Sequence, residues 1–425
     1  MMKDSIDFGN MEIPRLFRRL LIPTVLGMLF SAAFVITDGI FVGRGIGSDA
    51  LAAVNITAPL FLINTGVGLM FGVGASVVAS IHLSHGKART ARINVTQAVA
   101  VSSLILAAYS LAVCLFAPEV ARLLGCSQRL QPLVLKYMYW FVPFLPFSAL
   151  LSSGMFFIRL DGSPNYAMWC NAVPALINIV LDYVFIFLLD WGMFGAALAT
   201  SLGYVVGAAM ILIYLSRRHN VIRFCRVKTS RKSLRLTRRN VGYMCRLGLS
   251  TFLCEGAIAA MMFTGNYVFI RHLGEDGVAT YGVLMYVQFI FVAIDIGYSI
   301  GCAPIISYHY GARNHPELRN LLTKGLKVMG ILGIMMTIAA ISLSGTLANI
   351  FVGYDATLCE LTRHAFHLFS FAFLLAGFNI FLSSFFTALN NGGVSAAISF
   401  LRTLVFQAAS VILLPMALDV DGLWW

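Results

Sequence analysis

Two acidic side chains stand inside long apolar runs of this sequence, where a charge is costly. Asp182 lies near the middle of INIVLDYVFIFLL at residues 177–189, and Asp38 lies in FVITDGIFVG. Insertion scales assign roughly 2.5–3.5 kcal/mol to a charged side chain at membrane depth, so such residues normally face a protein interior or a wet cavity. We therefore expect a function for them, although Asp182 could instead be a helix-end residue or a structural partner for a buried hydroxyl.

Two uncharged polar residues accompany Asp182. Asn178 precedes it by one helical turn, so both side chains project from one face of a helix, and Thr200 lies in the next apolar run. Two carboxylates that face one cavity repel each other, which favours a bound proton. Two carboxylates, an amide oxygen and a hydroxyl could equally form an all-oxygen cage for a hard cation such as Na⁺. The residues support both a proton site and a Na⁺ site.

The second half of the chain carries a candidate polar cluster of its own. Its members are Glu255 in STFLCEGAIAAMM, Asp295 in FVAIDIGYS and Arg402 in SFLRTLVFQ. An unpaired guanidinium inside a span is costly, so we expect Arg402 to point inward and lie near one of the two acids. Pro23, in the first apolar run, frees a backbone carbonyl and provides a hinge; a static kink near the membrane interface explains it equally well.

The elements that position these residues are predicted to be membrane helices. The chain is 59% hydrophobic and 11% charged, whereas soluble proteins carry about 25% charged residues. A helix needs about 20 apolar residues to cross the hydrocarbon core. The eleven predicted spans are residues 16–42, 51–83, 95–117, 133–158, 168–189, 194–215, 247–270, 278–308, 326–352, 361–389 and 394–418.

Basic residues predict the orientation of these spans. Lys and Arg number 30 against 18 Asp and Glu, and residues 216–240 contain ten Lys or Arg and no acid. By the positive-inside rule, residues 216–240 and the amino terminus lie on the cytoplasmic side of the membrane. The loop that holds Arg122, Arg129 and Lys136 is a weak exception to this pattern. The run 216–240 could also be a lipid or nucleic-acid patch, but a basic linker between two halves is the better interpretation, and we expect no nucleic-acid partner.

The two halves of the sequence repeat each other. GSDALAAV at 47–54 corresponds to GEDGVATY at 274–281, and similar matches follow the second and eighth spans. Such repeats are typical of transporters. We predict an all-α integral membrane protein of two six-helix bundles related by a pseudo-twofold axis: an N-lobe at 1–215, a cytoplasmic linker at 216–240 and a C-lobe at 241–425. The closing DVDGLWW matches DWGMFGAA, which opens the sixth span, so we expect the chain to stop before a twelfth helix.

Several motifs resemble the MATE (multidrug and toxic compound extrusion) transporters, in particular the bacterial DinF-like and MepA-like branch. They are DGSPNYAMWCNAVPALINIVLDYVFIF at 161–187, the following GAALAT, ALAAVNITAP after the first span and PIISYHYGA after the eighth. The resemblance covers nearly the whole chain. It implies twelve helices in two lobes, a V-shaped central cavity, and rocker-switch export of drugs or metabolites in exchange for Na⁺ or H⁺.

The resemblance also implies roles for individual residues. In DinF-like members an acid in helix 1, an Asn and an Asp one turn apart in helix 5, and a Thr in helix 6 form the cation site. Here these are Asp38, Asn178, Asp182 and Thr200, where Na⁺ could bind, and the helix 1 proline that bends on protonation is Pro23. Glu255 resembles a helix 7 acid that the NorM-like branch pairs with a helix 10 acid. The tenth span here has no acid, so the resemblance does not extend to that pair.

These observations together predict a cation-coupled antiporter that exports amphipathic, often cationic compounds. A lipid-linked precursor flippase of the same superfamily is the alternative, but it would need cationic cavity residues where this chain offers acids. The eight cysteines are scattered without CxxC, and no HExxH or His cluster occurs, which argues against a metal site and an enzyme. We expect a monomer in the bacterial inner membrane with a small-molecule substrate, lipid contacts and no cofactor beyond the coupling ion.

Overall fold

The computed structural model describes residues 13–126, 128–227, 230–352 and 356–424, which form helices and loops and no strand. The predicted all-α fold is therefore confirmed for these residues. The first helices are α1 (Ile13–Gly45), α2 (Ser48–Ser84), α3 (Ala88–Leu115), α4 (Ala117–Leu123), α5 (Gln131–Phe141), η1 (Val142–Phe144), α6 (Leu145–Leu160), α7 (Pro164–Asp182), η2 (Tyr183–Leu188) and α8 (Gly192–Ser216). Then follow α9 (Arg231–Gly311), α10 (His315–Val352), α11 (Ala356–Phe369), α12 (Ala372–Ala388), α13 (Gly392–Phe400), η3 (Leu401–Phe406), α14 (Gln407–Leu418) and η4 (Asp419–Leu423).

Ten of the predicted spans coincide with helices of suitable length and composition. Within the described part of the chain, nine candidate spans are found, or ten when α11 and α12, bent by 49°, count as one broken span. The remaining predicted span, residues 247–270, lies within α9. Several of its side chains fall outside the described residues, so that span stays a prediction.

α9 cannot be straight along its 81 residues. The rings of Phe269 and Tyr281 stack with their centroids 4.5 Å apart, whereas twelve residues of straight helix would rise about 18 Å. The chain therefore reverses direction between these two residues. α9 thus has a first arm before Phe269 and a second arm after Tyr281.

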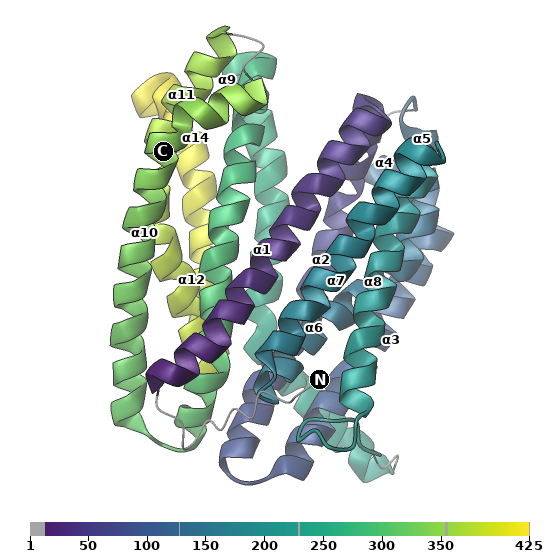
Figure 1. The fold of residues 1–425 in the computed structure, drawn as a ribbon, viewed down its shortest axis with the longest axis vertical. Helices are drawn as coiled ribbons and strands as arrows, with labels where there is room; N and C mark the ends of the chain where they lie inside the picture. Colours follow the sequence, from purple (N-terminus) through teal and green to yellow (C-terminus); the bar gives the residue numbers. More distant parts are fainter. Residues whose placement is uncertain (1–12, 127, 228–229, 353–355, 425) are drawn as a thin grey trace.

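The helices form two groups. Figure 1 shows α2–α8 on one side of the molecule and α9–α14 on the other, with α1 running obliquely between them. α1 packs against α7 in the first group and against α9 in the second. The division of the chain into lobes at 1–215 and 241–425 stays a prediction.

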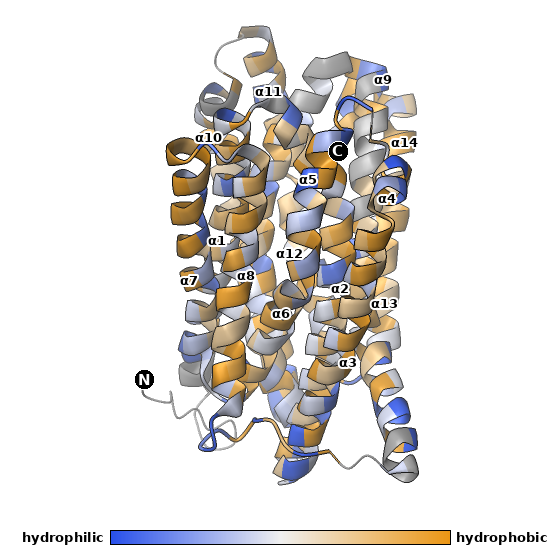
Figure 2. Ribbon diagram, turned by 90° about the vertical axis from the view of Figure 1, so that its right-hand side faces the viewer, coloured by the Kyte–Doolittle hydropathy of each residue, from blue (hydrophilic) through white to orange (hydrophobic). Residues whose placement is uncertain are grey.

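Apolar side chains cover the outside of the bundles. Leu104 and Leu111 of α3 are 72% and 61% exposed, and Ile331 and Ile338 of α10 are each 59% exposed. Figure 2 shows hydrophobic colours along the length of the helices and hydrophilic colours concentrated at the connecting loops. Exposed apolar area on this scale is typical of helices that face lipid.

The two groups touch at one end of the molecule, which we call the linker face: the end where α2 and α8 finish and α3 begins. A Cβ on Gly74 of α2 would overlap the carbonyl of Met244 in α9, and a Cβ on Gly248 would overlap the carbonyl of Met70. Backbones this close tolerate only glycine. The structure is therefore closed by direct backbone contact near the linker face.

The opposite end carries the loop that is an exception to the positive-inside pattern. Arg129, between α4 and α5, donates to both carboxylate oxygens of Asp49 at 2.6 Å. Both side chains are largely exposed, and the adjacent carboxylate raises the pKa of Arg129. The positive charge of this loop is thus partly neutralised by an acid in the first turn of α2.

We expect Gly74→Ala and Gly248→Ala to open the linker face. Overpacking usually costs about 1–3 kcal/mol, so the equilibrium should shift toward the open form at least about fivefold. The measurement is labelling by a water-soluble thiol reagent of a cysteine placed at Ser80 of α2, which is fully buried and whose hydroxyl donates to the Pro304 carbonyl of α9 at 3.3 Å, in a background without the native cysteines.

Gly242→Ala and Gly256→Ala of α9 are matched controls, because a Cβ at either position meets no described atom within 4 Å. Unchanged labelling in the Gly74 and Gly248 variants would show that these contacts do not hold the face closed.

Candidate functional site

The structure brings three of the four predicted cation-site residues into one hydrogen-bonded chain. Asp38 lies late in α1, Asn178 near the end of α7 and Thr200 in α8. The Thr200 hydroxyl lies 3.4 Å from Asp38 Oδ1 and accepts from Asn178 Nδ2 at 3.4 Å. It also lies 3.0 Å from the Ala196 carbonyl. Since a hydroxyl has a single hydrogen, Thr200 can donate to only one of these two acceptors at a time.

Asp182, the fourth residue, is completely buried and lacks hydrogen-bond donors. Neither of its carboxyl oxygens, nor Asn178 Oδ1, has a hydrogen-bond partner in the described part of the chain. The carboxyl group of Asp38 and the amide group of Asn178 are polar neighbours of Asp182. The Thr200 hydroxyl serves Asp38 and not Asp182, so the pair is strongly undersatisfied, because a buried acceptor without a partner costs about 1–3 kcal/mol or more. A proton or a small cation would relieve this deficit.

The backbone changes its helix type at Asp182. α7 ends there, and the next six residues, Tyr183–Leu188, form a π-helix. A Cβ on Gly45, at the end of α1, would overlap Ile186 within this π-helix. The close contact holds the end of α1 against η2 and so keeps Asp38 beside Asp182. π-helical turns occur frequently at functional sites.

Two glycines set the spacing between α7 and α8. A Cβ on Gly203 would lie 3.3 Å from the Pro174 carbonyl and 3.4 Å from Asn178 Cβ, and one on Gly207 would lie 3.0 Å from Pro174 Cγ. Small residues allow membrane helices to approach closely. This approach places Thr200 within reach of Asn178.

Two tyrosines at the site were missed by the sequence analysis. Tyr204 lies near Asp38, and Tyr137 of α5 lies near both acids. Tyr204 also stacks on Phe61, with ring centroids 6.1 Å apart. Its position four residues after Thr200 puts it on the same helix face, so the spacing could have identified it. Nothing in QPLVLKYMYWF distinguishes Tyr137 from its aromatic neighbours.

The three polar residues of the second half do not form an ion-paired cluster. Among the described residues, no ion pair within 4 Å joins Arg402 to Glu255 or Asp295. Arg402 instead donates to Cys254 Sγ at 3.4 Å and to Thr403 Oγ1 at 3.2 Å. It lies in the π-helix η3 and is only half-buried, so water or a headgroup can solvate part of its charge. No direct ion pair is therefore seen among the described residues, but the Cys254 partner of Arg402 is the residue next to Glu255. The expectation that Arg402 points inward and lies near one of the acids stays a prediction.

The two acids of that half face different helices. A Cβ on Gly377 of α12 would lie 3.0 Å from Asp295 Oδ1, and Asp295 is 3% exposed. Glu255 lies against α2, where a Cβ on Gly66 would be 3.3 Å from Glu255 Cβ. Glu255 is thus at the boundary between the helix groups, and Asp295 is inside the second group. No cluster of three or more His, Cys, Asp or Glu that could bind a metal occurs in the described ranges.

Pro23 does not interrupt α1. The helix is continuous from Ile13 to Gly45, and Pro23 is buried within it. Because proline has no N–H, the carbonyl of Arg19 lacks its usual helical partner. The Thr24 hydroxyl donates to the neighbouring Leu20 carbonyl at 2.7 Å. The hinge role of Pro23 stays a prediction.

Comparisons with known proteins agree with this architecture. The MatE family profile matches residues 23–184 and 253–412. The multidrug export protein MepA of Staphylococcus aureus (strain MRSA252) is 24% identical over 413 residues, covering 95% of this chain and 86% of MepA.

Two solved structures share the fold. The MATE transporter VcmN of Vibrio cholerae superposes with a TM-score of 0.87 at 19% identity, covering 97% of this chain and 92% of VcmN. A MOP-superfamily transporter from Pyrococcus furiosus gives a TM-score of 0.86 at 22% identity, covering 100% of this chain and 93% of its own. The resemblance inferred from the sequence is confirmed, and the chain belongs to the MatE family of multi-pass membrane transporters, which are not enzymes.

Proposed function

We propose that this protein is a cation-coupled antiporter that exports drugs or metabolites. The observation that carries the proposal is the neighbouring pair Asp38 and Asp182. Asp182 is fully buried and has no hydrogen-bond partner among the described residues, and the Thr200 hydroxyl serves Asp38 alone. The name of the MepA relative, a multidrug export protein, supports export as the direction of transport. The acids favour substrates that are amphipathic and cationic over the anionic substrates of a lipid-linked precursor flippase.

The coupling ion is Na⁺ or H⁺, bound by the two carboxyl groups with Asn178 and Thr200. Binding neutralises a charge that is otherwise buried without partners, so the ion stabilises the conformation in which the pair is closest. A substrate that prefers the other conformation then competes with the ion through the shared equilibrium. An ion can shift that equilibrium only by its difference in affinity for the two states. No further cofactor is needed, and a monomer suffices.

Alternating access in this proposal is a rocker switch between the two helix groups. The backbone contacts Gly74–Met244 and Gly248–Met70 close the linker face. That face carries the basic residues around the end of α8, so it is the cytoplasmic face of a bacterial inner membrane, as is the amino terminus. The structure then represents a state closed toward the cytoplasm, and substrate entry requires these contacts to separate.

We expect Asp38→Asn and Asp182→Asn to remain folded and to lose gradient-driven efflux, because an amide cannot be protonated or bind a cation as a charge partner. The measurement is efflux of a fluorescent lipophilic cation from proteoliposomes. A loss of at least tenfold in the efflux rate corresponds to about 1.4 kcal/mol of coupling free energy between the ion and the substrate. Glu255→Gln should have a smaller effect. Export at the wild-type rate by both aspartate variants would rule out this pair as the coupling site.

The identity of the ion is tested by heating the purified protein with Na⁺ or K⁺. If Na⁺ binds the site, saturating Na⁺ at 100 times its Kd should stabilise the wild type by about 2.7 kcal/mol, and Asp182→Asn should abolish the effect. If H⁺ is the ion, Na⁺ and K⁺ should act alike, and a pH gradient alone should drive efflux. Selective stabilisation by Na⁺ that persists in Asp182→Asn would place the Na⁺ site elsewhere.

A further inference from the structure

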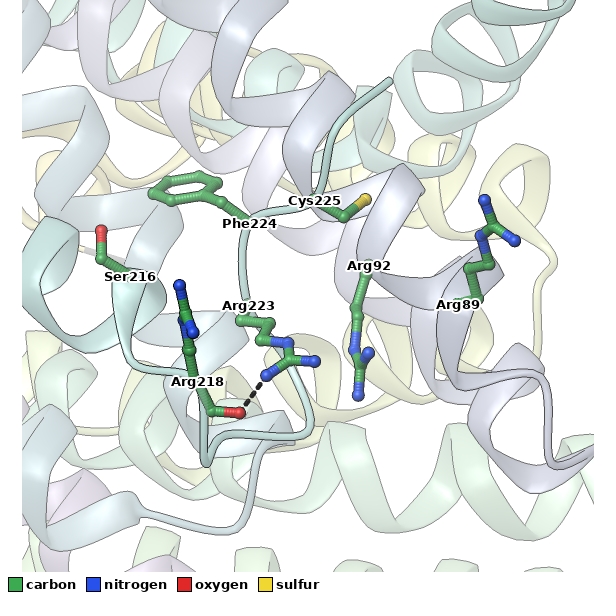
Figure 3. A pocket seen from close by; sticks show the side chains of 7 residues that line it. All are labelled: Arg89, Arg92, Ser216, Arg218, Arg223, Phe224 and Cys225. Carbon is green, nitrogen blue, oxygen red and sulfur yellow. Dashed lines mark hydrogen bonds between the residues drawn. The ribbon is translucent and has the colours of Figure 1, made fainter. Parts of the chain in front are cut away.

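Four arginines surround a cavity at the linker face. Arg89 and Arg92 come from the start of α3, and Arg218 and Arg223 come from the segment that follows α8. The cavity has a volume of about 490 Å³ and no acidic residue in its lining, which Ser216, Phe224 and Cys225 complete. Figure 3 shows Arg92 projecting from the helix and Arg223 projecting from the loop toward this space. We call it the arginine pocket.

The loop that carries half of the pocket is firmly anchored. The buried carboxylate of Asp161 accepts from the backbone N–H of Ile222 at 2.6 Å and from the Tyr214 hydroxyl at 2.8 Å. The Ile222 side chain is fully buried in the core, and the N–H of Phe224 donates to the Leu215 carbonyl at 2.9 Å. Positions fixed in this way need little ordering when a ligand binds.

The arginines keep most of their donors available. Arg92 Nε donates to the Val221 carbonyl at 2.8 Å, and Arg223 Nη1 donates to the Arg218 carbonyl. A guanidinium has five N–H donors, and in the described chain no carboxylate lies within 4 Å of any of these four groups. Like charges gathered around one cavity repel each other, and an anion with several oxygens would relieve this repulsion. Arginine is especially suited to phosphate because its fork matches two oxygens at once.

The position of the pocket indicates where the anion comes from. Arg89 and Arg92 lie just before the predicted apolar span 95–117 of α3, and the pocket residues of the linker follow the end of α8 at Ser216. The pocket therefore lies just outside the apolar spans, where lipid phosphates are expected. Basic clusters at the cytoplasmic end of membrane helices attract anionic lipids. A lipid phosphate can therefore reach these arginines while its acyl chains stay beside the exposed apolar face of α3.

We propose that the arginine pocket binds the phosphate of an anionic phospholipid headgroup. The bound phosphate bridges the start of α3 and the segment that leads to α9. The two are already joined beyond the pocket, since Gln97 Nε2 donates to Thr237 Oγ1 at 2.8 Å and Asn240 Nδ2 donates to Asn94 Oδ1 at 2.7 Å. The lipid therefore braces the linker segment against the first helix group and favours the closed linker face.

The test compares the thermal stability of the purified full chain in detergent as phosphatidylglycerol, phosphatidylcholine or inorganic phosphate is added. Phosphatidylglycerol should stabilise the wild type at lower concentrations than phosphatidylcholine. The double variant Arg89→Gln with Arg218→Gln changes two exposed positions. It should need about 25-fold more phosphatidylglycerol for the same stabilisation, because each basic residue contributes roughly fivefold to the affinity. Arg217→Gln with Arg226→Gln is the matched control: it removes the same charge from two linker positions that do not line the pocket, and it should weaken the effect much less than the pocket variant does.

Three results would overturn the proposal. Equal stabilisation by the two lipids would show that the headgroup charge is irrelevant. An equal loss in the control variant would show that only the overall surface charge matters. If inorganic phosphate stabilises the wild type fully and phosphatidylglycerol adds nothing, the pocket serves a soluble anion and not a lipid.

Discussion

The cost of an unneutralised carboxylate inside a membrane bundle governs the first half of this protein. Asp182 is buried without a hydrogen-bond donor, and Asp38 shares the hydroxyl of Thr200 with a backbone carbonyl. A purely structural polar group would have satisfied partners, because unsatisfied buried acceptors destabilise a fold. The deficit is useful only if something mobile fills it in one state of the cycle. This deficit at the carboxyl pair is the physical basis of the proposed ion coupling.

The proposed mechanism also requires an equilibrium between a closed and an open linker face that an ion can bias. Close backbone contacts between helices are the structural basis of that equilibrium. Helices in lipid associate by packing and not by hydrophobic burial, so small residues determine where they can meet. Gly45 and Gly203 bring α1, α7 and α8 together around the carboxyl pair, whereas Gly74 and Gly248 join the two helix groups. The first pair of glycines holds the site rigid. The second pair lets the backbones of α2 and α9 meet beside a core in which side chains of both helices, including Phe71 and Met244, pack together.

The sequence alone predicted features that depend on residues close in the chain or on the summed length of apolar runs. Apolar length predicted ten of the spans, and the one-turn spacing of Asn178 and Asp182 predicted that they share a face. Features that depend on distant partners could not be predicted. The π-helix after Asp182 depends on how α1 packs there. The reversal within α9 is different, because it falls at GEDG, between the predicted spans 247–270 and 278–308. Arg402 was expected to lie near an acid; its observed hydrogen bonds are to a thiol and a hydroxyl, which the sequence did not indicate, and the expected proximity stays a prediction.

One helix connects the two polar sites of the first group. α8 carries Thr200 beside the carboxyl pair and ends at Ser216 in the arginine pocket, and it contains no break between them. Sixteen residues of α-helix span about 24 Å, and a continuous helix transmits a shift at one end to the other. The acidic pair thus lies in the interior and the arginines lie at the linker face. Under the two proposals above, an ion-driven shift of α8 reaches the loop that carries Arg218 and Arg223.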